Sequence, residues 1–129
     1  MPVRTKRWND PALADDGFRL LVTRYRPRGV KKADETWDEW WPELGPSRAL
    51  HAAFWGKTGR PLTFAEYAPR YLEEMQAQAF RIRALHDRAA AGETITLLCS
   101  SACTDPSRCH RTLLARLIEP ASGRRSQRR

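Results

Sequence analysis

Two apolar, β-branched segments of the chain predict strands of a buried sheet. Residues 18–25 read Phe-Arg-Leu-Leu-Val-Thr-Arg-Tyr, follow an Asp-Asp-Gly turn and end before Pro27. Residues 94–99 read Thr-Ile-Thr-Leu-Leu-Cys without a charge, which is typical of a strand buried on both faces of a mainly parallel sheet. We therefore expect residues 94–99 to form the central strand, with a short strand at residues 3–6 helping to complete the sheet.

Between these strands, apolar residues recur at intervals of three and four and predict helices. The aromatic spacing across residues 37–44 predicts a first helix, and residues 47–56 predict a short second one. The longest helix is expected over residues 63–92, where it opens with the capping-box sequence Thr-Phe-Ala-Glu. A bend or a restart of this helix is expected near Pro69.

The order of strand, helices, strand and final helix predicts an α/β fold. The Asp105-Pro106 pair, a capping residue before a proline, predicts a last helix that ends at about Ile118. Since parallel strands need long crossovers, we expect a small, mainly parallel sheet flanked by helices, a Rossmann-like three-layer sandwich. The length favours a single α/β domain over residues 1–119, followed by a basic, disordered tail at residues 120–129.

The composition is basic, with 23 Lys and Arg against 15 Asp and Glu and a net charge of +8. Residues 120–129 contain four of the arginines and no acidic residue. A basic balance indicates an anionic small molecule or nucleic-acid phosphate as the partner.

No apolar run approaches the roughly 20 residues that cross a bilayer, and the N-terminus lacks a secretory signal. We expect a cytoplasmic protein with no membrane partner.

All three cysteines lie between Cys99 and Cys109, and an odd number cannot all pair, so reduced thiols are expected. Cys103 precedes the predicted last helix, where amide N–H groups and nearby arginines would lower its pKa. It is the candidate nucleophile, and His110 is the candidate general acid or base. The alternatives are a small apolar role for Cys99, and a capping and packing role for His110.

Cationic residues are expected to gather at the same edge of the sheet as these thiols. If the two strands are parallel neighbours, the loops that follow them meet beyond their carboxyl ends, where α/β proteins bind ligands. Arg24, Arg28 and Arg111 are therefore the candidate anion-binding residues, and Arg26 lies in the same loop.

The same segment also has the form Cys-x3-Cys-x5-Cys-His, four potential ligands for zinc or an iron–sulfur cluster. The spacing lacks the paired Cys-x2-Cys of structural zinc sites. The adjacent Cys109 and His110 would also point to different sides of a helix. We therefore predict no metal site and no cofactor, and a metal bound by Cys99, Cys103, Cys109 and His110 stays open as the alternative.

A set of residues spread along the chain resembles a known family. It comprises Asp16-Gly17-x-Arg19-x-Leu21-Val22-x-Arg24, Pro27-Arg28-Gly29-Val30-x-Lys32, Trp41, Glu43-Leu44, Pro46-Ser47, Leu50, Phe64, Tyr71, Glu74 and Thr96-Leu97-Leu98. This order is similar to the YeaO-like branch of domain-of-unknown-function family 488, over about residues 3 to 118. The resemblance implies a small bacterial cytosolic α/β protein of no established activity.

The chain departs from that branch at two places. Tyr25-Arg26 stands where the branch commonly has Leu-Trp, and Cys109-His110-Arg111 stands where it commonly has Asn-His-Ala. The Cys-His-Arg triplet is similar to longer members of the wider family. The resemblance thus implies that Arg24, Arg28 and His110 form a shared anion-binding site, and that Cys103 and Cys109 are a specialisation of this sequence.

The sequence therefore favours a protein that binds an anionic, phosphate-containing ligand at the carboxyl ends of its strands. A thiol-dependent enzyme with Cys103 as nucleophile is the first alternative. A nucleic-acid-binding module is the second. The sequence does not decide whether the protein is an enzyme.

Overall fold

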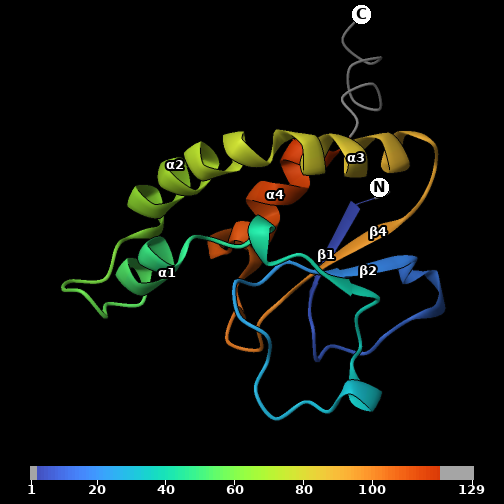
Figure 1. Ribbon diagram of the computed structural model, residues 1–129, viewed down its shortest axis with the longest axis horizontal. Coiled ribbons are helices and arrows are strands. Elements are labelled where there is room, and N and C mark those ends of the chain that lie inside the picture. The colour runs from blue at the N-terminus through green and yellow to red at the C-terminus, as the bar shows by residue number, and fades with distance from the viewer. Residues whose placement is uncertain (1–2, 120–129) are drawn as a thin grey trace, which may run out of the picture.

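The computed structural model, which describes residues 3–119, contains a four-stranded sheet in which every neighbouring pair is parallel (Figure 1). The strand order is β1-β4-β2-β3. The strands are β1 (Val3–Arg7), β2 (Phe18–Leu21), β3 (Glu39–Trp40) and β4 (Ile95–Cys99). The predicted α/β class, with a parallel sheet flanked by helices, is confirmed.

Strand β4 lies at the centre of the sheet, as its uncharged sequence predicts. It pairs with β1 on one side and β2 on the other, so that Leu97 lies opposite both Thr5 and Leu20. All five of its residues are buried. The short strand expected at the N-terminus is present as β1.

Residues 3–119 contain four α-helices, and a side-chain cap opens each of the first two. Ser47 caps the first of them, accepting a hydrogen bond from the Leu50 amide at 3.1 Å. The predicted capping box is formed, since the Thr63 hydroxyl accepts from the Glu66 amide at 3.2 Å and the Glu66 carboxylate accepts from the Thr63 amide at 2.9 Å. The helices are α1 (Arg48–Phe54), α2 (Phe64–Met75), α3 (Ala79–Ala90) and α4 (His110–Ile118).

The helix predicted over residues 37–44 is wrong. This segment contains β3 and then a 3-10 turn at Pro42–Leu44. Its amides are engaged by β2, with Asp38 donating to Arg19 O at 2.7 Å and Trp41 donating to Leu21 O at 2.9 Å. The aromatic rings are spaced as in a helix, but pairing with the neighbouring strand determines the backbone.

The interruption of the long helix is real, but it is not at Pro69. Helix α2 continues through Pro69, which is exposed, and ends at Met75. A 3-10 turn at Gln76–Gln78 then separates α2 from α3. Gln78, with φ −105° and ψ 20°, leaves the helical conformation, and so the chain restarts there.

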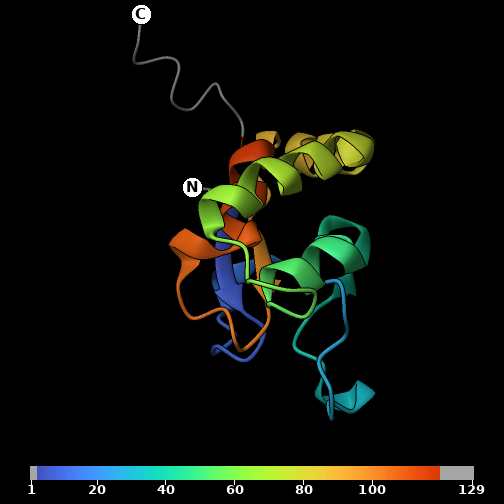
Figure 2. The same ribbon diagram turned by 90° about the vertical axis from the view of Figure 1, so that its left-hand side faces the viewer.

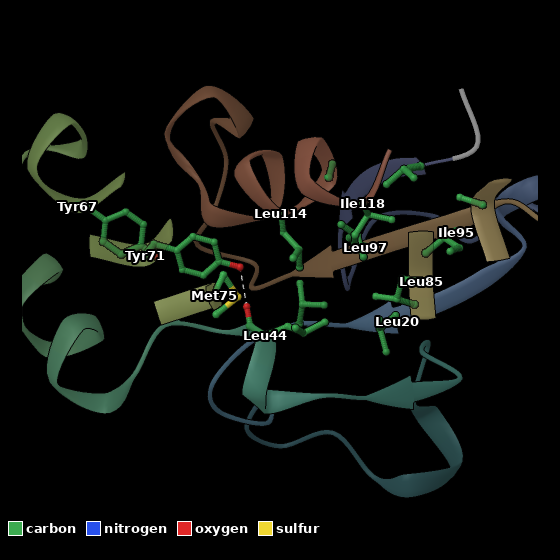
Figure 3. Packing of buried hydrophobic residues seen from close by; sticks show 14 of the residues in the cluster. Leu20, Leu44, Tyr67, Tyr71, Met75, Leu85, Ile95, Leu97, Leu114 and Ile118 are labelled. Carbon is green, nitrogen blue, oxygen red and sulfur yellow. Dashed lines mark hydrogen bonds between the residues drawn. The ribbon is translucent and has the colours of Figure 1, made fainter. Parts of the chain in front are cut away.

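The two faces of the sheet are covered differently (Figures 1 and 2). Helices α2, α3 and α4 pack on one face, and the largest cluster of buried apolar residues lies beneath them (Figure 3). In this cluster the buried Tyr71 hydroxyl donates to Leu44 O at 2.7 Å. On the other face Trp37 packs with Leu21 and Leu98, so the connection between β2 and β3 covers that side.

A buried polar network ties the start of β2 to the sheet. The Asp16 carboxylate lies 2.9 Å from the Lys6 ammonium and also pairs with Arg19. The Thr96 hydroxyl donates to Asp16 O at 2.7 Å. Gly17 has φ 68°, and a Cβ there would lie 2.2 Å from Thr94 O. The turn before β2 therefore requires glycine.

Within residues 3–119, no helix is long and apolar enough to cross a bilayer. The predicted tail at residues 120–129 lies outside the part of the chain that the structure describes.

Candidate functional site at the carboxyl ends of the strands

A cavity of about 110 Å³ opens where β2 and β4 end. Because the strands are parallel, their carboxyl ends share one edge of the sheet, and the loops that follow them meet there. Cationic, aromatic and thiol side chains from these loops and from α1, α2 and α4 line the cavity. They belong to Thr23, Arg24, Tyr25, Pro46, His51, Phe54, Trp55, Tyr67, Cys99, Ser100, Arg108, Cys109 and His110.

Arg24, a predicted anion-binding residue, lines this cavity. Its Nε donates to Pro46 O at 2.8 Å, which fixes the guanidinium plane against the segment that precedes α1. The two backbones approach closely at this point, since a Cβ on Gly45 would lie 2.5 Å from the Arg24 amide nitrogen. Arg24 therefore takes its position from backbone packing.

Arg108 is the second arginine of the cavity, and it was not among the predicted residues. It ends a 3-10 turn, Pro106–Arg108, in which the Asp105 carboxylate accepts from the Ser107 amide at 3.0 Å. The exposed Arg108 side chain also borders a neighbouring surface depression. Its position depends on how this turn enters α4, which the sequence pattern did not resolve.

The predicted N-cap of the last helix, Asp105, is wrong by four residues. The Asp-Pro pair opens only the 3-10 turn, and α4 begins at His110 with Cys109 as its N-cap. Cys109 is extended, at φ −136° and ψ 143°, and so interrupts the helical backbone. As a result, Cys109 lies at the helix start, while Cys103 lies in the preceding loop.

The three thiols converge, although only their closeness in sequence was evident beforehand. The Cys99 Sγ lies 3.1 Å from the Cys103 Sγ and 3.2 Å from the Cys109 Sγ, and all three sulfurs fall within 4.8 Å of one another. These separations exceed the bond length of a disulfide, about 2.05 Å, and all three cysteines are free. Cys99 and Cys109 are buried, whereas Cys103 is partly exposed.

The thiols of the cluster have different pKa values. Hydrogen bonds from Cys109, Cys99 and Ser100 lower the pKa of Cys103 and outweigh the opposing effect of burial. Hydrogen bonding to Cys103 and burial raise the pKa of Cys99. The low pKa of Cys103 thus arises mainly from neighbouring thiols, and not from the position at a helix start that the sequence suggested.

His110, the predicted acid or base, is buried at the start of α4. Its Nε2 lies 2.8 Å from Val22 O, and its ring centroid lies 5.3 Å from that of Tyr71. Burial lowers the pKa of His110 below its usual 6.5, so the ring is neutral near pH 7. Because a carbonyl can only accept, Nε2 carries the hydrogen.

The remaining predicted arginines lie elsewhere. Arg28 is exposed in the loop after β2 and does not line the cavity. Arg26 pairs with Glu35 at 2.7 Å and stacks over Trp37. Arg111 is only 4% exposed, and its Nη2 donates to Cys103 O at 3.1 Å. Of the predicted arginines, only Arg24 reaches the cavity.

A family model and several individual proteins each match most of this chain. The family model DUF488-N3a, described as the active DUF488-N3 subclade, matches residues 3–122. The chain is 39% identical over 101 residues to the uncharacterised protein YeaO of Escherichia coli strain K12, covering 78% of this chain and 84% of that protein. It is 33% identical over 122 residues to the uncharacterised proteins Rv3073c of Mycobacterium tuberculosis and Mb3100c of Mycobacterium bovis, covering 90% of this chain and 92% of theirs. No solved structure matches the chain.

Proposed function

The chain belongs to the DUF488 family, and from the arginines of its cavity we propose that it binds a small phosphate-containing anion at the carboxyl ends of its strands. One observation carries the proposal: Arg24 and Arg108 line a single cavity at this edge of the sheet. Guanidinium groups suit phosphate because their planar N–H donors match its oxygens. The carboxyl edge of a parallel sheet is also where this class of fold binds ligands.

The aromatic part of the lining favours a ligand with a planar group. His51 lies between two rings, 5.1 Å from the centroid of Tyr25 and 6.3 Å from that of Trp55. Trp55 is 48% exposed and Tyr25 is 47% exposed, so both rings offer free surface at the cavity on which a planar group could stack. A nucleoside phosphate, with a base to stack and a phosphate to neutralise, combines both requirements.

We also propose that the protein lies in the cytoplasm, where thiols stay reduced.

Calorimetric titration with inorganic phosphate, pyrophosphate and a nucleoside monophosphate tests the proposal. Saturable binding is expected, and Arg24→Ala and Arg108→Ala should each weaken it by about tenfold or more, the cost of a lost charge-assisted hydrogen bond. Arg28→Ala is the matched control, because it removes the same charge from a residue outside the cavity. Absence of binding, or equal losses in Arg24→Ala and Arg28→Ala, would overturn the proposal.

A thiol-dependent enzyme is the second candidate, favoured by the reduced thiols beside the cavity. Cys103 would be the nucleophile because it is partly exposed and accepts hydrogen bonds from neighbouring thiols. Alkylation with iodoacetamide, followed by peptide mass spectrometry, compares the cysteines directly. Modification of Cys103 at least about tenfold faster than a free thiol supports this candidate. Modification at or below the rate of a free thiol excludes it.

Nucleic-acid binding remains a third candidate on charge alone, since residues 120–129 contain four arginines. Binding of this kind weakens steeply with salt and is insensitive to nucleotide sequence. A salt titration with a duplex oligonucleotide tests it. If a chain that ends at residue 119 binds the oligonucleotide as tightly as the full chain does, residues 120–129 make no contribution to binding.

A further inference from the structure

We propose that Cys99, Cys103 and Cys109 form a three-thiolate site for a single Zn²⁺ ion. The proposal is independent of anion binding, because it rests on the sulfurs and not on Arg24 or Arg108. Thiolates are among the ligands that zinc prefers in proteins. The three sulfurs lie within 4.8 Å of one another and come from the end of β4, the following loop and the N-cap of α4.

The spacing of the sulfurs fits one ion. Thiolates bound to zinc at about 2.3 Å in tetrahedral geometry lie about 3.8 Å apart. The Cys99 Sγ lies 3.1 Å and 3.2 Å from its two partners, so the site needs to expand by only about 0.6 Å. An iron–sulfur cluster spreads its thiolates over several metal atoms and therefore needs a wider separation. The geometry favours a mononuclear site.

The backbone holds the ligands before any metal arrives. Cys99 ends the central strand, and its carbonyl oxygen accepts from the Trp8 amide at 2.8 Å. The Cys103 amide donates to Ser100 O at 3.0 Å, which folds the loop back toward β4. Cys109 is fixed by the first turn of α4, where the Thr112 amide donates to Cys109 O at 3.2 Å. Such preorganisation reduces the entropic cost of binding.

A buried cation beside the cluster is suited to the charge of this site. Three thiolates and Zn²⁺ carry a net charge of −1, and the guanidinium of Arg111 donates to Cys103 O from Nη2. Within residues 3–119, Arg111 Nε and Nη1 are buried without a hydrogen-bond partner. Asp10 is an electrostatic neighbour of Arg111, but its carboxylate is engaged by Arg7 at 3.0 Å. An anionic centre would stabilise a cation that is otherwise costly to bury.

The fourth coordination position is left for an external ligand. His110, the next residue, uses Nε2 for Val22 O and so does not supply that atom to the metal. Cys99 and Cys109 both line the cavity, and we place the open position on that side. Zinc sites with three protein ligands and one exchangeable ligand are typical of catalytic centres.

Metal binding by the full chain, reduced and freed of metal with a chelator, provides the test. Zinc titrated in competition with a chromogenic chelator should bind as one ion per chain. Cobalt in its place should give the sulfur-to-cobalt charge-transfer absorption of thiolate ligation. Cys103→Ser and Cys109→Ser should each weaken zinc binding by more than about a hundredfold, since losing a direct ligand costs more than losing an outer-shell partner. Ser101→Ala, in the same loop, should leave the zinc affinity unchanged.

A denaturation curve measured without metal shows separately whether each variant is folded. Cys103 is the most informative position, because it is partly exposed and its replacement leaves the buried sulfurs in place. Failure of the reduced parent chain to bind zinc would overturn the proposal. Zinc binding by folded Cys103→Ser within about threefold of the parent would also overturn it, since a ligand contributes far more. Isolation of the protein with a disulfide between two of these cysteines would instead assign the cluster to redox chemistry.

Discussion

His110 donates from Nε2 to the carbonyl oxygen of Val22 at 2.8 Å, and this bond joins the first turn of α4 to the residue that follows β2. The two residues are 88 positions apart in the chain. The bond orients the helix start, and with it Cys109, over the end of the sheet. A histidine that the sequence suggests as an acid or base thus has a structural role as well.

Replacing this histidine should therefore destabilise the fold. His110→Phe keeps a ring against Tyr71 but leaves the Val22 carbonyl without its donor, so the free energy of unfolding should fall by about 1–3 kcal/mol. Urea denaturation measures the change. His51→Phe is the control, because the half-buried His51 contacts rings that a phenyl group can still contact. Equal stability of His110→Phe and the parent would contradict this role.

Tyr71→Phe tests the hydrogen bond drawn in Figure 3. The hydroxyl that donates to Leu44 O at 2.7 Å is fully buried, so its loss should cost about 1–2 kcal/mol of unfolding free energy. Thermal unfolding gives the measurement. Tyr25→Phe, in a ring that is 47% exposed, should change the melting temperature little. A melting temperature for Tyr71→Phe that matches this control would show that the bond contributes nothing net.

Asp16→Asn should be destabilising in a pH-dependent way. Burial raises the pKa of Asp16, but hydrogen bonds from Lys6 and the Leu13 amide more than offset this and hold it below 3.8. The stabilisation is therefore fully present above pH 3.8 and is lost as the pH falls through the lower folded value. At pH 7 the variant should lose about 3–5 kcal/mol of unfolding free energy, the cost of breaking a buried ion pair.

Denaturation curves at pH 7 and pH 3 provide this comparison. The gap between Asp16→Asn and the parent should narrow in acid, because protonation removes the same charge from the parent. Asp15→Asn is the matched control, since its carboxylate is 70% exposed and pairs only at the surface with Arg4. It should cost less than about 1 kcal/mol. A gap for Asp16→Asn that is the same at both pH values would contradict the assignment.

Gly45→Ala links backbone packing to the proposed anion site. The added Cβ would meet the Arg24 amide nitrogen at 2.5 Å, so the segment before α1 must move away from the end of β2. Phosphate affinity should fall by about tenfold, as for loss of Arg24 itself, together with a lower melting temperature. Ala49→Gly, at an exposed position of α1, is a control that perturbs the helix by about 1 kcal/mol without touching Arg24. Unchanged phosphate affinity in Gly45→Ala would show that the close packing at Gly45 does not position Arg24 for anion binding.

The strands and caps of the fold could be predicted from the sequence because short-range chemistry determines them. The uncharged run before Cys99 has few alternatives to a central strand, and the hydroxyl of Thr63 satisfies helix amides wherever its helix is packed. The segment around Trp37 and Pro42 could not be assigned in this way. Its aromatic spacing fits a helix, but its backbone pairs with β2, a partner that local patterns do not contain.

The candidate site was predicted in its location and only partly in its members. The carboxyl edge of the sheet follows from the parallel pairing of β2 with β4, and it brings Arg24 to the cavity as expected. Arg108 was missed because the Asp105-Pro106 pair has the same form before a 3-10 turn as before a helix. The convergence of the three thiols was missed for the same reason, since it depends on the extended conformation of Cys109.

The order of strands in the sheet also bears on how the chain acquires its structure during synthesis. Strands β1 and β2 do not pair with each other, because β4 lies between them, and β4 is the last strand to be made. A ribosome-bound chain that has not yet exposed residue 99 therefore lacks the strand that joins its first two. The sheet must assemble late, from contacts that are distant in sequence, and this slows folding. Until then the edges of β1 and β2 that face β4 are unpaired, and such edges can pair with other chains.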